Sequence, residues 1–340
     1  MYLTLGSDNF NNVLAEESEC IGFIKMDSKI INQRGYGVNE IPHECNKIVI
    51  EHSIDFMNYF LFYQHNIDIL SKYEVTISNL NAPGIETPFW TLFSDYNRIA
   101  ELTQGYLTLG DVSGIITLVL EGINRNKLEN IRALEIGSWT GFSSYFISKT
   151  INTYSVNNKL TCVDTWGDVS GSAPRGSYAD YVDVLHLFRS VSKGLNTSNL
   201  IRSMAMTSFE ALNVLRDDIY NFIFIDGDHR YQATYYEILY SILKAKIGAV
   251  IFGHDYRHYN NALLKPDKEI IELNKNEHIT YIDGREFEMG VIAAVDEIFE
   301  GNAKLVTHSS VWYKEITQED KDRAKFLISQ LENDPIKQIG

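Results

Sequence analysis

Residues 131–152 contain the sequence feature that most constrains the fold. A short apolar run, residues 131–136, ends at Gly137, and a second glycine, Gly141, opens a segment with apolar residues at helical spacing. This pattern predicts a tight turn between a buried strand and a helix. In such a turn a ligand can approach the backbone closely. The chain is therefore expected to form an α/β domain with a ligand site at this turn.

The residues of the turn favour S-adenosylmethionine (SAM) over a dinucleotide. Glu135 stands two positions before Gly137, and Ser138 occupies the place of the second glycine in the dinucleotide pattern Gly-x-Gly-x-x-Gly. That pattern frees backbone N–H groups for a pyrophosphate, which SAM lacks. We interpret Glu135, Gly137, Ser138 and Gly141 as cofactor-binding residues. Ser138 disfavours a nicotinamide-dependent oxidoreductase, while the motif alone also fits a turn with a purely structural role.

Two further predicted strands add candidate cofactor residues. Residues 159–163 end at Asp164, about twenty residues after the glycine turn, where an α/β nucleoside site places the acid that binds the ribose hydroxyls. Asp164 and the adjacent Thr165 are therefore assigned to the cofactor site. A strand at 200–204 leads to Ser208, which is expected to cap a helix over 209–215 and to flank the adenine.

Acids and histidines follow two more apolar runs. Residues 221–225 form a continuous apolar run typical of a buried parallel strand, and Asp226, Asp228 and His229 follow it. Residues 249–252 lead in the same way to His254 and Asp255. Because the carboxyl ends of parallel strands meet at one edge of a sheet, these side chains are expected to share a site.

Three segments, residues 224–231, 253–256 and 290–299, resemble the class I SAM-dependent methyltransferases related to the macrocin and macrolide-sugar O-methyltransferases. With the glycine turn, the resemblance covers about residues 105–315. It implies a doubly wound, mostly parallel, seven-stranded Rossmann-like sheet with an antiparallel seventh strand, matched here by the pair 304–306 and 311–314. In metal-dependent relatives, acids at the positions of Asp226, His254 and Asp255 hold Mg²⁺, and a histidine at the position of His229 acts as base in some of them.

His254 departs from that pattern, because an imidazole is a poor ligand for a hard cation. Asp226, Asp255 and His254 are the candidate metal ligands, and the departure leaves room for Mn²⁺ or for no metal. Asp226 is also expected to contact the cofactor. His229 is the favoured catalytic base, since its ordinary pKa lies near the working pH, and Asp228 is the rival. Asp228 and His229 also fit structural roles as loop and helix-cap residues, and His254 also fits a role in packing against the sheet edge.

The composition predicts a small-molecule acceptor. A formal net charge of −15 argues against a nucleic-acid partner, whose phosphates require basic surfaces. No signal peptide or membrane-spanning run is recognised, and three scattered cysteines suit a reducing cytoplasm. We therefore expect an O-methyltransferase acting on a sugar, polyol or other natural product. The alternatives are a metal-independent N-methyltransferase and a non-catalytic SAM-binding protein.

Two parts are expected in the chain. Residues 1–103 are interpreted as an accessory α/β region, in which the short segments 22–26 and 47–50 hint at strands, and residues 104–340 as the methyltransferase domain. A helix within 50–63 carries aromatic residues on more than one face, which favours a homo-oligomer. Loops at 166–176 and 257–288 are expected to cover the cofactor and the acceptor. An amphipathic helix over 318–331 is expected to bury Phe326, Leu327 and Leu331.

Overall fold

The computed structural model divides the chain into two compact units, Met1–Arg98 and Ile99–Gly340. The boundary lies within helix α4 (Phe89–Thr103), close to the predicted boundary at residue 103. The structure describes residues 2–5, 20–24, 35–36, 45, 47–51, 68, 72–78, 86–105, 107–126, 128, 130–152, 158–167, 183–256 and 266–333. Three predicted segments lie outside these residues: most of the aromatic helix within 50–63, the loop from 168 to 176, and residues 257–265.

The first unit contains a six-stranded sheet with the order β3-β2-β1-β4-β5-β6. Its strands pair in parallel, apart from the antiparallel pair of β5 and β6. Strands that the sequence only hinted at near residues 22–26 and 47–50 are β2 and β4. The strands are β1 (Tyr2–Leu5), β2 (Cys20–Ile24), β3 (Gly35–Tyr36), β4 (Lys47–Glu51), β5 (Glu74–Ser78) and β6 (Glu86–Pro88).

The second unit is built on a seven-stranded sheet with the order β14-β15-β11-β10-β7-β8-β9. Strands β7 to β11 are parallel, and β15 runs antiparallel to both β11 and β14. The predicted doubly wound α/β fold is therefore confirmed. The strands are β7 (Arg132–Ile136), β8 (Lys159–Asp164), β9 (Ile201–Ala205), β10 (Tyr220–Ile225), β11 (Ala245–Gly253), β14 (Lys304–Leu305) and β15 (Trp312–Glu315).

Strand β10 shows why the apolar runs become central strands. All six of its residues are buried. Ile223 and Ile225 belong to the main apolar core, and Phe224 packs on Phe252 of β11 with ring centroids 5.3 Å apart. Phe222 faces α5, where a Cβ on Gly122 would lie 2.5 Å from its ring. Helices thus cover both faces of the strand, which requires a continuous apolar run rather than an alternating one.

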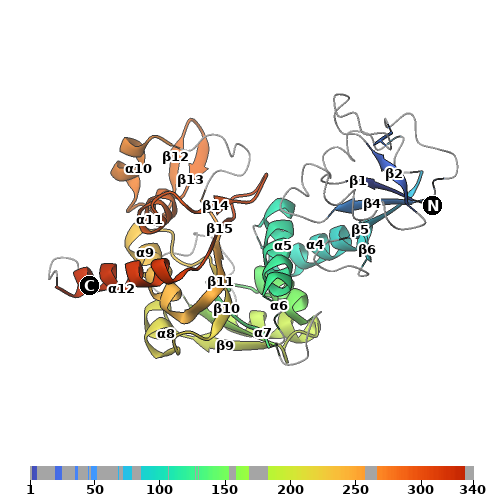
Figure 1. Ribbon diagram of the computed structural model, residues 1–340. Helices are drawn as coiled ribbons and strands as arrows, with labels where there is room; N and C mark the ends of the chain where they lie inside the picture. Colours follow the sequence, from blue (N-terminus) through green and yellow to red (C-terminus); the bar gives the residue numbers. More distant parts are fainter. Residues whose placement is uncertain are drawn as a thin grey trace. The chain divides into compact units, whose positions relative to one another are not determined.

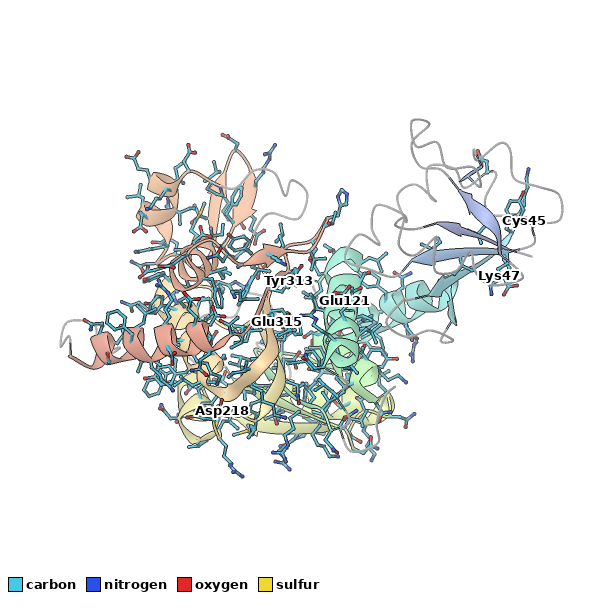
Figure 2. All side chains as sticks on the ribbon, in the orientation of Figure 1. Cys45, Lys47, Glu121, Asp218, Tyr313 and Glu315 are labelled. Atoms are coloured by element: carbon cyan, nitrogen blue, oxygen red, sulfur yellow. The ribbon has the colours of Figure 1, made fainter. Side chains whose placement is uncertain are left out.

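The helices of the second unit form two layers around this sheet (Figure 1), with α5 and α6 in one layer and α8, α9, α11 and α12 in the other. Two ion pairs connect helices of these layers to β15 and to the loop before β10. Glu315 of β15 pairs with Arg125 at the end of α5, and Asp218 pairs with Lys321 of α12 (Figure 2). The helices are α5 (Leu109–Arg125), α6 (Phe142–Asn152), α7 (Val184–Gly194), α8 (Ser208–Val214), α9 (Tyr231–Lys244), α10 (Lys268–Asn274), α11 (Met289–Phe299) and α12 (Gln318–Asn333).

Helix α12 differs in part from its prediction. Leu327 and Leu331 are partly buried against the core, but Phe326 is 60% exposed, so its predicted burial was wrong. Ala324 and Ile328, four positions apart, form the centre of the buried stripe, and Phe326 lies on another face of the helix. A short hairpin of β12 (Thr280–Ile282) and β13 (Arg285–Phe287) precedes α11. Among the described residues, no helix is long and apolar enough to cross a membrane.

Candidate active site

The predicted glycine turn lies between β7 and α6. Gly137 and Gly141 have φ angles of +81° and +95°, which glycine adopts without steric strain. The N–H of Gly141 donates to the carbonyl of Ser138 at 2.8 Å and closes the turn. The N–H of Gly137 donates to the carbonyl of Val163 in β8 at 2.9 Å. The turn is thereby fixed at the carboxyl edge of the sheet, where open α/β sheets bind ligands.

Glu135 and Ser138, both predicted as cofactor ligands, have side chains buried beneath this turn. Glu135 is fully buried, and one of its oxygens accepts hydrogen bonds from Ser138 at 2.7 Å, from Ser144, and from the thiol of Cys162 at 3.2 Å. Burial raises the pKa of the Glu135 carboxyl, and the surrounding hydroxyl groups act in the opposite direction. The two side chains support the turn from the interior and do not line its outer surface.

Asp164 joins the turn to the loop after β8. Its carboxylate accepts hydrogen bonds from the backbone N–H groups of Trp139 at 2.8 Å and Trp166 at 2.7 Å. Burial raises the pKa of Asp164, and these two N–H groups act against that shift. The indole N–H of Trp166 also donates to the Trp139 carbonyl at 2.6 Å, while the hydroxyl of Thr165 donates to the Gly167 carbonyl at 3.2 Å. Asp164 therefore lies beside the turn.

The predicted capping role of Ser208 was wrong by one residue. Thr207 caps α8, because its hydroxyl accepts a hydrogen bond from the N–H of Glu210 at 3.2 Å. The Glu210 carboxylate accepts one from the N–H of Thr207 at 2.9 Å, which completes a capping box. The acid three positions after Thr207 selects it as the cap. Ser208 is the first residue of α8, and its hydroxyl hydrogen-bonds to Glu237 of α9.

Asp226, His229 and Asp255 come together where β10 and β11 end, and we call these three residues the acid cluster. Nε2 of His229 lies 3.2 Å from Oδ2 of Asp255 and 3.9 Å from Oδ1 of Asp226. One ligand atom from each residue lies within 4.8 Å of the other two. Ligands at right angles on a cation are roughly 3 Å apart when each bond is about 2.1 Å long. The donor set of two carboxylates and one imidazole therefore fits a divalent cation.

His254, predicted as a metal ligand, lies beside the acid cluster with both ring nitrogens facing carboxylates. Nδ1 is 2.7 Å from Oδ1 of Asp255 and 3.8 Å from Oδ1 of Asp226. Nε2 is 3.3 Å from Oδ2 of Asp111, a residue of α5. The ring thus has no nitrogen directed away from an acid, and it is a neighbour of the cluster.

The charges of the acid cluster are strongly coupled. Burial alone lowers the pKa of His229, but Asp255 and Asp226 outweigh it and raise this pKa to about 9. Burial raises the pKa of Asp255, but His254 and His229 outweigh it and hold this pKa below its ordinary value. Burial and the charge of Asp255 raise the pKa of Glu288, at the start of α11, to about 8. Asp255 and Asp226 thus favour the protonated form of His229.

Asp228, the rival base, is engaged by Arg230. Nε of Arg230 lies 3.0 and 3.1 Å from the two carboxylate oxygens, and its backbone N–H donates to one of them at 3.0 Å. Burial raises the pKa of Asp228, but these contacts outweigh it and lower this pKa below its ordinary value. A carboxylate stabilised by a guanidinium group accepts a proton less readily.

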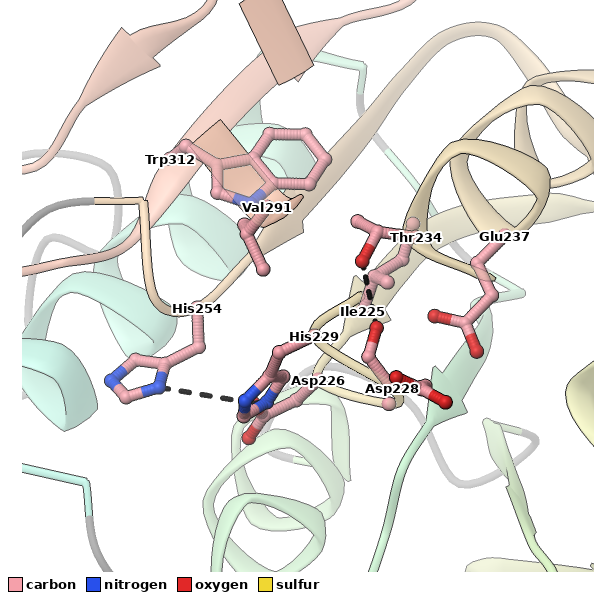
Figure 3. Close-up of a pocket in the computed structure, with 10 residues that line it drawn as sticks. Ile225, Asp226, Asp228, His229, Thr234, Glu237, His254, Val291 and Trp312 are labelled. Carbon is pink, nitrogen blue, oxygen red and sulfur yellow. Dashed lines mark hydrogen bonds and ion pairs between the residues drawn. The ribbon is translucent and has the colours of Figure 1, made fainter. Parts of the chain in front are cut away.

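A small pocket lies against the loop that follows β10. It encloses about 10 Å³, room for about one water molecule. Figure 3 shows His254 on one side of the pocket and Glu237 of α9 on the other. Burial, with a smaller contribution from the charge of Asp228, raises the pKa of Glu237 to about 8. The pocket is lined by Ile225, Asp226, Gly227, Asp228, His229, Thr234, Glu237, His254, Val291 and Trp312.

Gly137 connects the glycine turn to the acid cluster. A Cβ at this position would lie 1.8 Å from the carbonyl oxygen of Asp226. The N–H of Asp226 donates to the carbonyl of Ile136 at 2.8 Å. Only glycine lets the ends of β7 and β10 pack this closely, so the turn and the acid cluster are parts of one site.

Asp111 and Glu237 were not predicted as site residues, because both lie within helices rather than after strands. Each nevertheless has a sequence signal. Asp111 is the only charged residue among residues 107–120, and Glu237 is the only one between Arg230 and Lys244. A single acid within a long uncharged stretch is either exposed or buried with partners, and both of these acids are buried.

The part of the sequence that contains this site matches a model of a known protein family. A family model described as "Methyltransferase domain" matches residues 134–256, a range that includes the glycine turn, Asp164 and the acid cluster. No curated protein is significantly similar in sequence to the chain.

Three solved structures are among those similar to this one. A putative O-methyltransferase from Klebsiella pneumoniae has 13% identity and a TM-score of 0.44, over 65% of this chain and 89% of that one. An O-methyltransferase from Bacillus cereus in complex with SAH has 14% identity and a TM-score of 0.42, over 67% and 91%. The O-methyltransferase TomG from Streptomyces achromogenes, involved in tomaymycin synthesis and in complex with SAM, has 14% identity and a TM-score of 0.43, over 66% and 89%.

Residues 134–256 are thus similar in sequence to a methyltransferase domain, and they belong to a unit built on a seven-stranded, mostly parallel sheet.

Proposed function

We propose that this protein is a SAM-dependent O-methyltransferase whose acceptor is a hydroxyl group of a small metabolite, such as a sugar, a polyol or another natural product. The observation that carries the proposal is the packing of Gly137 on the carbonyl of Asp226, which makes the cofactor turn and the acid cluster one site. A net charge of −15 supports a small acceptor rather than a nucleic acid.

The cofactor lies along the glycine turn in this proposal, with its ribose at Asp164. SAM supplies the methyl group, which is transferred in line to the acceptor oxygen. The protein must then align the acceptor and remove its proton. The acid cluster lies next to the turn and provides groups for both tasks. His229 is the favoured base, because Arg230 holds the carboxylate of the rival Asp228.

A divalent cation, Mg²⁺ or Mn²⁺, fits the acid cluster and would be held by Asp226, His229 and Asp255. Such a cation lowers the pKa of a bound hydroxyl and orients two neighbouring oxygens. In that case His229 serves as a ligand and the acceptor is a vicinal diol. Without a cation, His229 accepts the acceptor's proton only after it has released the proton that Asp226 and Asp255 stabilise on it. The two routes predict different acceptors, and metal titration separates them.

The proposal is tested first by thermal protection. We expect SAM and its demethylated product to raise the unfolding temperature, and NADH to leave it unchanged. Asp164→Ala is expected to abolish protection by SAM. The matched control is Asp217→Ala, which removes a largely exposed acid paired with Lys244 away from this edge of the sheet. Protection by NADH, or none by SAM, would contradict the proposed cofactor.

The acceptor class is tested by transfer of a labelled methyl group from SAM to a panel of diols, single alcohols and amines. Labelled ethers from hydroxyl compounds, lost in His229→Ala, are expected. Labelling of amines alone would instead identify an N-methyltransferase. If SAM binds but His229→Ala and Asp226→Ala keep the biological role, the protein is a non-catalytic SAM-binding protein.

A further inference from the structure

A chain of buried and partly buried charged groups leads from helix α5 to the acid cluster. Oδ2 of Asp111 lies 3.3 Å from Nε2 of His254, and Nδ1 of His254 lies 2.7 Å from Oδ1 of Asp255. The other carboxylate oxygen of Asp255 lies 3.2 Å from Nε2 of His229. Asp111 is fully buried, and the side chain of His254 is 13% exposed. Burying a charged group costs free energy unless the group is paired with an opposite charge. Each group of this chain is paired in this way, and the pairs together link Asp111 to the acid cluster.

Asp111 is fixed by two separate segments of the chain. At the start of α5, its Oδ2 accepts hydrogen bonds from the backbone N–H and the hydroxyl of Thr108, at 2.8 and 2.6 Å. Before β15, its Oδ1 accepts from the hydroxyl of Ser309 at 2.7 Å and the N–H of Ser310 at 3.0 Å. This is more than the start of a helix needs. The carboxylate cannot rotate without losing bonds, so it is a rigid ion-pair partner for the imidazole of His254, whose Nε2 makes no hydrogen bond.

His254 connects Asp111 to Asp255. Its backbone N–H donates to the carbonyl of Ile225 in β10 at 3.2 Å, which fixes the residue from the other side. Asp255 has a φ of +61°, a conformation that non-glycine residues rarely adopt and that often marks a functional constraint. With one oxygen occupied by His254, the other oxygen of Asp255 is directed toward His229. The ring of His254 thus sets the orientation of this carboxylate.

We propose that Asp111 and His254 form a positioning pair, which holds the carboxylate of Asp255 so that Asp226, His229 and Asp255 bind a divalent cation while His254 stays outside the ligand set. This inference rests on the proposed function only in that a cation is used at the acid cluster. Neighbouring groups that orient a metal ligand are typically worth 10- to 100-fold in metal affinity.

The test is a calorimetric titration of Mn²⁺ into the full-length, SAM-saturated protein. Wild type is compared with Asp111→Asn and His254→Gln, and each protein is also titrated with SAM. Either substitution is expected to weaken Mn²⁺ binding by about 10- to 100-fold and to leave SAM affinity unchanged. Asp217→Asn, which disrupts a pair with Lys244 away from the cluster, is expected to bind both ligands as wild type does.

The double variant, Asp111→Asn with His254→Gln, tests whether Asp111 acts through His254. If it does, the double variant binds Mn²⁺ no more weakly than His254→Gln alone. Additive losses would overturn the positioning role. So would a variant with a lowered unfolding temperature and unchanged Mn²⁺ affinity, because Asp111 then only stabilises the fold. Should Asp111→Asn not fold, His254→Gln alone decides, since unchanged Mn²⁺ affinity in it refutes the pair.

The same titrations separate this inference from the proposed function. SAM binding without Mn²⁺ binding in the wild type would overturn the positioning pair and leave the methyltransferase proposal intact. Absence of SAM binding would overturn the proposed function itself.

Discussion

Replacement of Gly137 by alanine is expected to force the glycine turn away from the acid cluster. The new methyl group would lie 1.8 Å from the carbonyl oxygen of Asp226, where such contacts essentially never fall below 3.0 Å, so the strand ends must separate by about 1.2 Å. This breaks the 2.8 Å hydrogen bond from Asp226 to Ile136, a loss of about 1 kcal/mol. The φ of +81° adds about 1–2 kcal/mol, and overpacking about 1–3 kcal/mol. We expect a total loss of about 3–6 kcal/mol in the free energy of unfolding.

Urea unfolding followed by circular dichroism measures this loss, and SAM titration measures its effect on the site. Gly284→Ala is a matched control, because Gly284 has a similar φ of +75° but no atom lies within 4 Å of an added Cβ. It is expected to lose only the conformational part, about 1–2 kcal/mol, and to bind SAM normally. Equal losses in the two variants would refute the argument from packing.

Three further predictions concern the surroundings of the turn and the cluster. Because the pKa of Glu237 rises from 4.5 to about 8 on folding, the folded protein keeps a proton that the unfolded chain releases, and stability falls as pH rises from 4.5 to 8. Glu237→Gln should flatten this decline in urea unfolding between pH 5 and pH 8; parallel curves would contradict it. Trp166→Phe removes the bond to the Trp139 carbonyl and should cost about 1 kcal/mol in the free energy of unfolding measured in urea, with unchanged stability as the contrary result. Mn²⁺ should bind the wild type more tightly than Mg²⁺, because the acid cluster contains an imidazole; the reverse order in competition titrations would argue against His229 as a ligand.

The sheet of the second unit was predictable because its strands are central. Residues 221–225 and 249–252 are apolar without alternation, since helices cover both faces of β10 and β11. The acids that follow them come to one edge by the geometry of parallel strands alone. The sequence therefore located Asp226, His229 and Asp255 without knowledge of any side-chain contact.

The rest of the site depends on contacts between distant segments. Asp111 meets Ser309 almost two hundred residues later, and no local pattern encodes that meeting. The sequence also does not show in which direction a side chain points. Glu135 was predicted to contact the cofactor, and the structure buries its side chain beneath the turn. The parallel sheet of the first unit was foreseen only as scattered strands, because its short runs do not reveal their order.

In each of the two large sheets, the strand that comes first in the sequence lies in the interior of the sheet. Strand β1 pairs with β2 and β4, and strand β7 pairs with β8 and β10, so each first strand ends with neighbours on both sides. Within the second unit, strands β7, β8 and β9 are synthesised before β10 and β11. They can therefore form the glycine turn and position Asp164 before the acid cluster is present. One edge of β7 stays unpaired until β10 is synthesised, and an unpaired strand edge can pair incorrectly with another strand. Folding of the second unit is thus expected to be sequential, with the glycine turn assembled before the acid cluster.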